Sequence, residues 1–203
     1  MRSAPLAFAG MVAACAAPVS LELSTAQLPD APRPELRVGE SWAYETPMGE
    51  RIEQRVLAVV DGSPVVAGSF ATRQPNVPCV VTLSRDVYAP HLGASGCSLP
   101  DYVADVSGNG SLFPLRVGNG AVWQVTMNFE DGRSDGYRYV CSVPSTARVS
   151  VPAGTYDVFV IECDSGFRQQ TYYYAPSIET HVLFRRKSRT DGSVEASLIE
   201  EPT

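Results

Sequence analysis

Cysteine is the residue whose spacing in this chain points most directly to covalent chemistry. Four cysteines lie in the region of regular patterning: Cys79, Cys97, Cys141 and Cys163. Four cysteines allow three disulfide pairings. The stretch VSVPAGTYDVFVIEC contains a Pro-Ala-Gly turn between two alternating runs. Folding it as a hairpin brings Cys141 and Cys163 within reach across neighbouring strands, provided that Pro144 introduces a bulge.

Cys79 then pairs with Cys97 by elimination, around a segment rich in Pro and Gly. Such a disulfide typically stabilises a fold by about 2–4 kcal/mol, mainly by restricting the unfolded chain. A zinc site is not favoured, because no Cys-x-x-Cys pair occurs. We therefore predict two disulfides and an oxidising compartment, with no metal site.

The other side chains capable of catalysis do not form a recognisable set. The sequence has two histidines, His91 and His181, and its GASGC stretch lacks the Gly-x-Ser-x-Gly elbow of many hydrolases. Asp157 and Glu162 fall on opposite faces of one expected strand, so they do not form an acid–base pair. We therefore expect no enzyme activity, no catalytic residue and no cofactor. A hydrolase of envelope polymers is the least favoured function.

Aromatic residues in the expected strands are candidates for binding. Alternation in TYYYA places Tyr172 and Tyr174 on one face, with Tyr173 on the other. The candidate ligand-facing aromatics, which together could line a concave apolar surface, are Trp42, Trp123, Tyr172 and Tyr174. The alternative is ordinary core and cross-strand packing.

A basic stripe follows in the next expected strand. Arg185, Lys187 and Arg189 alternate and so share one face, with Arg186 on the opposite face. On an acidic chain such a stripe could meet lipid phosphates or cell-wall carboxylates. The alternative is a solvated strand face.

The amino terminus looks like a processing segment. Residues 1–15, MRSAPLAFAGMVAAC, resemble the signal peptide of a bacterial lipoprotein, with VAAC as the lipobox. The resemblance implies that Cys15 is lipidated and anchors the protein in a membrane. Ala16 stands where an Asp would signal retention at the inner membrane, so the protein resembles an outer-membrane lipoprotein facing the periplasm. The alternative is an ordinary secretory signal and a soluble periplasmic protein.

Residues 16–35 contain four prolines and show no periodicity. This composition predicts a tether between the membrane and the domain. The alternative is an arm that docks on the domain through Leu21 and Leu23.

From residue 36 to residue 203 the hydrophobic pattern has a period of two. AVWQVTMNF, for example, places Ala121, Trp123 and Val125 on one face. Similar runs are separated by short turns such as EDGRSDG and PAG, and about ten or eleven strands follow from this pattern. We predict a single all-β domain, a strongly curved antiparallel sheet or an open β-barrel.

The letters LRVG occur twice, at 36–39 and at 115–118. Each copy opens a series of strands, so the domain could consist of two similar halves, 36–111 and 112–203. The alternative is convergence on a convenient sequence for entering a strand. Gly39 and Gly118 both suit a turn that needs positive φ.

Two further stretches resemble a bacterial envelope domain family of unknown function. VPAGTYDVFVIEC is similar to its hairpin, and TYYYAPSIETHVLFRR is similar to its aromatic-Tyr-Ala-Pro turn and basic strand. PLRVG followed by Trp123 also fits, so the resemblance covers roughly residues 112–190. The chain departs from the family at Ile178 and Glu179, where members often have a glycine. The resemblance implies an exported protein with a curved β-sheet, and it implies no catalytic residue.

The charge balance narrows the class of partner. The net charge is −6 and the pI is about 4.9, the opposite of a typical nucleic-acid-binding protein. We expect a non-enzymatic envelope lipoprotein that binds an apolar or amphipathic molecule, a lipid in particular. The alternative is a structural or assembly accessory that contacts another envelope protein.

Overall fold

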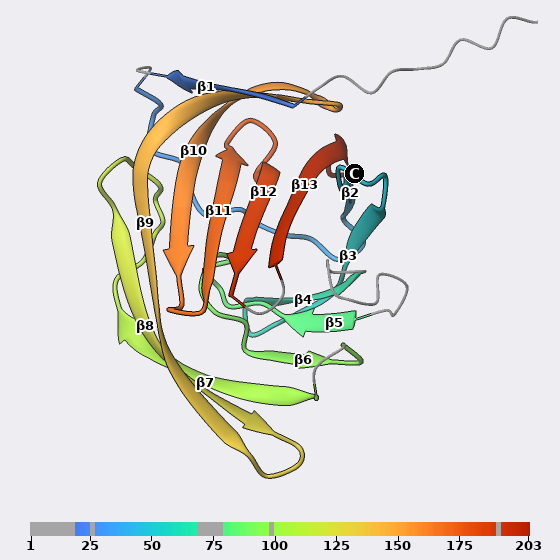
Figure 1. The fold of residues 1–203 in the computed structure, drawn as a ribbon, viewed down its shortest axis with the longest axis vertical. Coiled ribbons are helices and arrows are strands. Elements are labelled where there is room, and N and C mark those ends of the chain that lie inside the picture. The colour runs from blue at the N-terminus through green and yellow to red at the C-terminus, as the bar shows by residue number, and fades with distance from the viewer. Residues whose placement is uncertain (1–18, 25–26, 69–78, 98–99, 190–191) are drawn as a thin grey trace, which may run out of the picture.

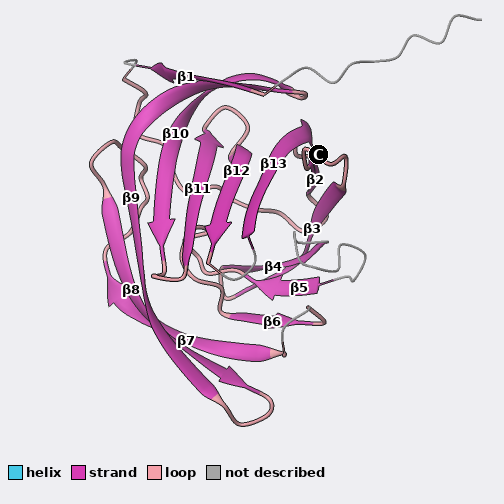
Figure 2. Cartoon of the chain, viewed as in Figure 1, coloured by secondary structure: helices cyan, strands magenta, loops and turns pink. Residues whose placement is uncertain are grey.

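The computed structural model describes residues 19–24, 27–68, 79–97, 100–189 and 192–203, and these residues form strands without a helix (Figures 1 and 2). The first strands are β1 (Ser20–Ser24), β2 (Ser41–Glu45), β3 (Arg51–Val60), β4 (Ser63–Gly68), β5 (Cys79–Thr82), β6 (Gly93–Ser95) and β7 (Tyr102–Asn109). The others are β8 (Gly120–Phe129), β9 (Ser134–Val151), β10 (Gly154–Asp164), β11 (Arg168–Ala175), β12 (Thr180–Ser188) and β13 (Gly192–Glu200).

Strands β2 to β13 form a closed antiparallel barrel. Each strand pairs with the next one along the chain, and β13 returns to pair with β2, which closes a twelve-stranded ring. The predicted all-β class and curved antiparallel sheet are therefore confirmed, with the sheet closed into a barrel. Closure pairs the strand edges with one another, and this removes the exposed edges that make open sheets prone to aggregation.

Alternation along each strand decides which side chains enter the barrel. In β8 the apolar residues Ala121, Trp123 and Val125 are all buried, as the period of two predicts. The inward position opposite Trp123 is Gly108, where an added Cβ would lie 2.2 Å from the carbonyl oxygen of Val122. A glycine is therefore required where β7 and β8 approach closely.

The predicted disulfides are both present, Cys79–Cys97 and Cys141–Cys163. The register of β9 against β10 shifts between Val160 and Glu162, so β9 carries an extra residue beside Pro144. This is the expected bulge, and it sets Cys141 directly opposite Cys163, with their Cα atoms 4.1 Å apart.

The long strand β9 serves two partners in succession. Its first part, from Ser134 to Ser142, pairs with β8, and its last part pairs with β1. The β9–β10 hairpin then curls over, as Figure 1 shows, until β9 contacts β12 and β13. At the hairpin tip the Ala153 N–H donates to the Leu198 carbonyl at 3.2 Å.

The segment expected as a tether is docked on the domain where the structure describes it. Residues 20–24 form β1, whose backbone pairs with β9, and Ala31 pairs with Leu115 and is buried. The expectation of a free tether therefore does not hold for these residues. Leu23 is 85% exposed, so backbone hydrogen bonds dock the arm instead of the predicted leucine contacts.

The two LRVG copies form equivalent turns. Gly39 and Gly118 have φ of 93° and 94°. In each turn the glycine N–H donates to a valine carbonyl, and the valine N–H donates back to the residue after the glycine, all at 2.9 Å. The valines are Val56 in β3 and Val143 in β9. Residues 36–111 and 112–203 each begin at such a turn and each contribute six strands to the barrel.

The tryptophans that follow the two turns are not equivalent. Counted from the paired valines, Tyr44 occupies the position of Trp123, and Trp42 occupies the position of Ala121. All four side chains are buried on the same inward face. The repeated LRVG letters therefore mark turns that enter equivalent strands. Trp42, however, lies two residues before the position in its strand that corresponds to Trp123.

The equivalent turns allow a stability prediction. Gly39→Ala and Gly118→Ala should each lower the free energy of unfolding by about 1 kcal/mol, because a side chain disfavours positive φ. Urea unfolding monitored by tryptophan fluorescence would measure this loss. Gly136→Ala is the matched control, because Gly136 has no positive φ and an added Cβ there meets no atom closer than 3.6 Å. An equal loss in all three variants would contradict the assignment to backbone strain.

Candidate functional site

One side of the barrel interior is filled, and the other side holds a cavity beside a second core cluster that includes Val66, Val149 and Leu198. The filled side contains the disulfide Cys141–Cys163 and a cluster of buried apolar residues that includes Leu112, Phe113 and Ile161. The cavity measures about 1490 Å³ and is lined by residues of β2 to β7 and of β11 to β13, including Arg185 and Glu195 on the outer face of the sheet.

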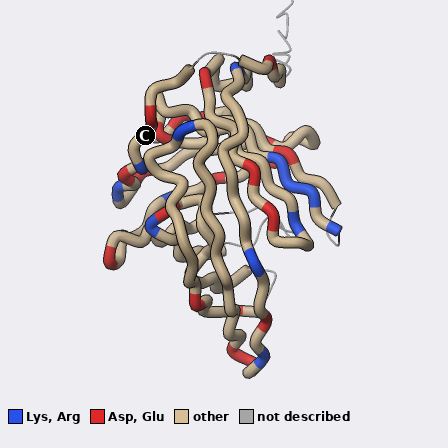
Figure 3. Tube along the Cα trace, turned by 90° about the vertical axis from the view of Figure 1, so that its left-hand side faces the viewer, with Lys and Arg blue, Asp and Glu red and all other residues tan. Residues whose placement is uncertain are grey.

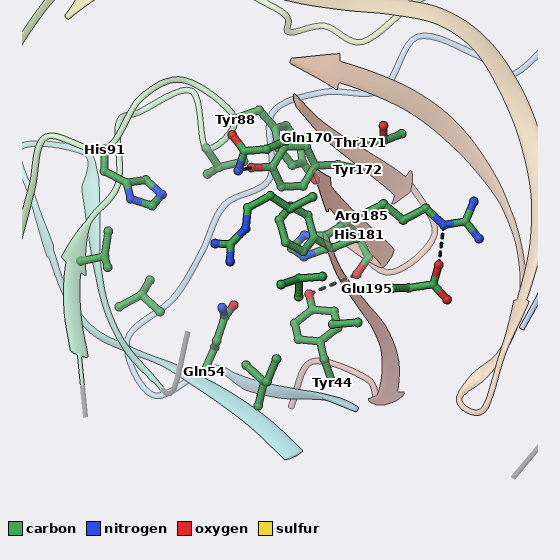
Figure 4. A pocket seen from close by; sticks show the side chains of 18 of the residues that line it. Tyr44, Gln54, Tyr88, His91, Gln170, Thr171, Tyr172, His181, Arg185 and Glu195 are labelled. Carbon is green, nitrogen blue, oxygen red and sulfur yellow. Dashed lines mark hydrogen bonds and ion pairs between the residues drawn. The ribbon is translucent and has the colours of Figure 1, made fainter. Parts of the chain in front are cut away.

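An aromatic group centred on His181 forms one wall of the cavity (Figure 4). The imidazole stacks on the Tyr44 ring at 4.8 Å between centroids, with 11° between the planes. The rings of Tyr172 and Phe184 meet it edge-on at 5.5 and 6.3 Å. The Tyr44 hydroxyl donates to the His181 carbonyl at 3.1 Å, so the wall is held by hydrogen bonding as well as by ring packing.

The loop between β5 and β6 supplies a second set of lining residues. Asp86 is buried in this loop, and its carboxylate accepts hydrogen bonds from the backbone N–H groups of Leu112 at 3.0 Å and Tyr88 at 3.4 Å. Burial raises the pKa of Asp86. These bonds hold the Tyr88 ring 4.8 Å from that of Tyr172. His91 and Gln54 project toward the same space from other parts of the barrel (Figure 4).

The part of the lining formed by the first half of β11 and by Arg186 of β12 is polar and carries positive charge. Arg168 and Gln170 in β11 alternate with outward residues and share the inward face with Tyr172, and Arg186 in β12 pairs with Gln170. The Gln170 amide donates to the Tyr172 hydroxyl, and the Tyr139 hydroxyl donates to the Gln170 carbonyl oxygen, both at 3.0 Å.

Both histidines of the chain line this cavity and are neutral at pH 7. Burial lowers the pKa of His181 to about 4. Burial, together with the positive charge of Arg168, lowers the pKa of His91 to about 4. Burial also raises the pKa of Tyr172 to about 12. At neutral pH these side chains therefore offer uncharged surface and hydrogen-bonding groups.

The four aromatics that the sequence singled out lie in two different places. Tyr172 lines the cavity. Trp42 borders it as well, but is 7% exposed and packs in a second core cluster, and its indole N–H donates to the Gln54 side chain at 2.8 Å. Trp123 and Tyr174 belong to the filled side and do not border the cavity. The expectation that these two face a ligand is corrected, because the segment carrying Leu112 and Phe113 occupies their side of the barrel.

The basic stripe has the expected parity, but its first member is already paired. Arg185 forms an ion pair with Glu195 at 2.6 Å, and its guanidinium lies 5.6 Å from the centre of the Tyr173 ring. Figure 4 shows this pair pointing away from the aromatic wall. Lys187 and Arg189 are exposed, and Figure 3 shows basic and acidic residues interspersed along neighbouring parts of the trace.

Sequence reasoning missed the interior cations. Alternation correctly predicts that Arg186 lies opposite the stripe, but it does not show that this face is the interior one, which also carries Arg168. The alternation Arg168, Gln170, Tyr172 could have linked the cation to the aromatic face. Cys15 lies outside the described residues, so its lipidation stays a prediction.

Among the residues that the structure describes, no three His, Cys, Asp or Glu side chains gather in a way that could hold a metal ion. The same residues include no helix with the length and apolar character needed to cross a membrane. The two disulfides favour a location in an oxidising compartment such as the periplasm, because such bonds persist there.

Comparison with known proteins gives one solved structure of note. No family model matches the chain, and no curated protein matches it. A crystal structure of the hypothetical lipoprotein YmcC from Escherichia coli (K12) is similar, with a TM-score of 0.48 and 12% sequence identity. The similarity covers 82% of this chain and 86% of that one.

Proposed function

We propose that the protein is a non-enzymatic envelope lipoprotein whose barrel binds an apolar or amphipathic molecule. In this proposal Cys15 carries the lipid anchor in the outer membrane, and the barrel faces the periplasm. The observation that supports binding is the cavity of about 1490 Å³, whose lining includes inward-facing residues of the barrel. Pockets for small organic ligands typically measure about 300–1,000 Å³, so the space is sufficient for a lipid-sized guest.

The lining suits such a guest. Half-buried apolar side chains border the cavity, among them Leu36, Leu83, Val87 and Ala94. They surround the aromatic wall with a surface from which water is favourably displaced. For an assembly accessory acting through protein contacts we expect a filled interior, so the cavity supports binding over that alternative.

A neutral apolar dye tests the proposal. The chain from residue 16 onward retains every described residue, and it should be exported so that its disulfides form. N-phenyl-1-naphthylamine should then bind saturably, with a rise in its fluorescence. Ala94→Phe, which fills the lining, should weaken this binding at least tenfold.

Val103→Phe is the matched control, because Val103 lies in β7 beside β6 and is 68% exposed. It adds a similar side chain outside the cavity, so dye binding should not change. Circular dichroism would verify that both variants fold. A lack of saturable dye binding by the unmodified chain would exclude the proposed function.

A further inference from the structure

The folded domain takes hold of the chain close to the cysteine that carries the lipid in the proposed function. Val19 packs against the second core cluster, and β1 begins at the next residue. Cys15 and Val19 are 4 positions apart in the sequence. A fully extended chain spans at most about 3.6 Å per residue, so the Cα atom of Cys15 lies within about 14 Å of that of Val19. The lipid anchor is therefore held close to β1.

Strand β1 lies at one end of the molecule. Figure 1 shows it at one end of the longest axis, with the turn between β8 and β9 at the other end. All five residues of β1 pair with β9, so the strand is fixed to the barrel by its backbone. An anchor close to β1 therefore brings this end of the barrel to the bilayer and directs the β8–β9 turn away from it.

One face of β1 presents apolar side chains to the surroundings. Leu21 and Leu23 pair with Val149 and Ala147 of β9, so the two leucines share one face of the sheet. Their partners in β9 are fully buried, but Leu21 is 38% exposed and Leu23 is 85% exposed. Among the described strands β1 pairs with β9 alone, so it is the outermost strand of the sheet. Two aliphatic side chains in such a place are stabilised when a bilayer interface covers them.

The opposite face of β1 is charged. Glu22 pairs with Arg148 of β9, and Arg148 forms an ion pair with Asp157 of β10 at 3.0 Å. The hydrogen bond to Asp157 and the nearby charge of Glu22 both raise the pKa of the Arg148 guanidinium. All three side chains are well hydrated, so this face favours water. The two faces of β1 therefore differ in the surroundings that suit them.

We infer that β1 lies on the surface of the bilayer that holds the lipid anchor, with Leu21 and Leu23 in the boundary between head groups and acyl chains. The face that carries Glu22 stays in water. This inference rests on the proposed function for the lipid at Cys15, and it is independent of what the cavity binds. Its distinguishing consequence is that a probe at position 23 contacts acyl chains, whereas a probe one residue earlier does not.

Tryptophan fluorescence in brominated bilayers tests this placement. The full chain is purified from an envelope fraction, acylation of Cys15 is verified by mass spectrometry, and the protein is reconstituted into phosphatidylcholine vesicles with brominated acyl chains, which quench tryptophan at short range. Leu23→Trp should lose about half of its added fluorescence relative to vesicles without bromine, because the ring reaches the acyl region. Trp42 and Trp123 are buried, and the unmodified chain supplies their contribution for subtraction.

Two matched controls locate the contact. Glu22→Trp places the same ring on the opposite face of β1, and Val103→Trp places it at a 68% exposed position in β7. Both should lose much less fluorescence than Leu23→Trp, and circular dichroism would verify that all three variants fold. Equal quenching at positions 22 and 23, or no more at 23 than at 103, would overturn the inference alone.

The state of Cys15 separates this inference from the proposed function. An unacylated Cys15 in the purified envelope protein would overturn the lipid anchor of the proposed function, and the inference with it. Binding of N-phenyl-1-naphthylamine does not enter this experiment, so weak quenching of an acylated Leu23→Trp protein leaves the binding proposal standing.

Discussion

Replacing Cys141 and Cys163 by alanine is expected to lower the free energy of unfolding by about 3–5 kcal/mol. Two effects add. The bond closes a loop with a sequence separation of 22 residues, and its loss gives the unfolded chain more freedom. The two cysteines are also 1% and 3% exposed within the filled side of the barrel, so the smaller side chains leave unfilled space there. Guanidinium chloride unfolding under non-reducing conditions would measure the loss.

The second disulfide is a matched control for this prediction. Cys79 and Cys97 have a similar sequence separation, 18 residues, but they lie outside the filled side, and Cys97 is half-buried. Their replacement by alanine should cost about 2–3 kcal/mol, because the entropic part is similar and little core packing is lost. A cost for the Cys141–Cys163 pair no larger than for this one would contradict the role given to the filled side.

Mild acid is expected to destabilise the protein through its two histidines. His91 and His181 have pKa values of about 4 in the folded protein, below the value of about 6.5 expected in the unfolded chain. Between these values the unfolded chain binds more protons, so the stability present above pH 6.5 is lost as the pH falls toward 4. Between pH 7 and pH 5 each histidine should contribute a loss on the order of 1–2 kcal/mol.

Urea unfolding at a series of pH values would measure this dependence. His181→Phe keeps a ring stacked on Tyr44 but cannot be protonated, so it should remove about half of the loss between pH 7 and pH 5. Combining it with His91→Gln should remove most of the remainder, because carboxyl groups ordinarily titrate near or below pH 4.3. An unchanged pH dependence in the double variant would show that other groups cause the destabilisation.

Most of the strands and both disulfides could be predicted from local pattern. The alternation in β8 correctly assigned Trp123 to the inward face, and the Pro-Ala-Gly turn with the bulge at Pro144 aligned Cys141 with Cys163. These features depend on the period of a strand and on turn residues, which act over a few positions of the chain. The arm at residues 20–24 was harder, because backbone pairing with β9 leaves little trace in side-chain pattern.

The candidate site was only partly predictable. Alternation can say that Arg168, Gln170 and Tyr172 share a face, but it cannot say that this face borders empty space. That depends on which segments enter the barrel: Asp86 binds the backbone of Leu112 and so holds this segment on one side, where it covers Tyr174 and leaves the Tyr172 side open.

The sequence by itself determined most of the strands, their turns, the disulfide pairing and the side-chain face where alternation is unbroken. The tertiary structure alone decided that β13 closes on β2, that Trp123 packs within the filled side, and that a cavity borders Tyr172. The reason is physical: side-chain direction follows from the period of one strand, whereas an interior volume is what remains after segments far apart in the chain have packed together.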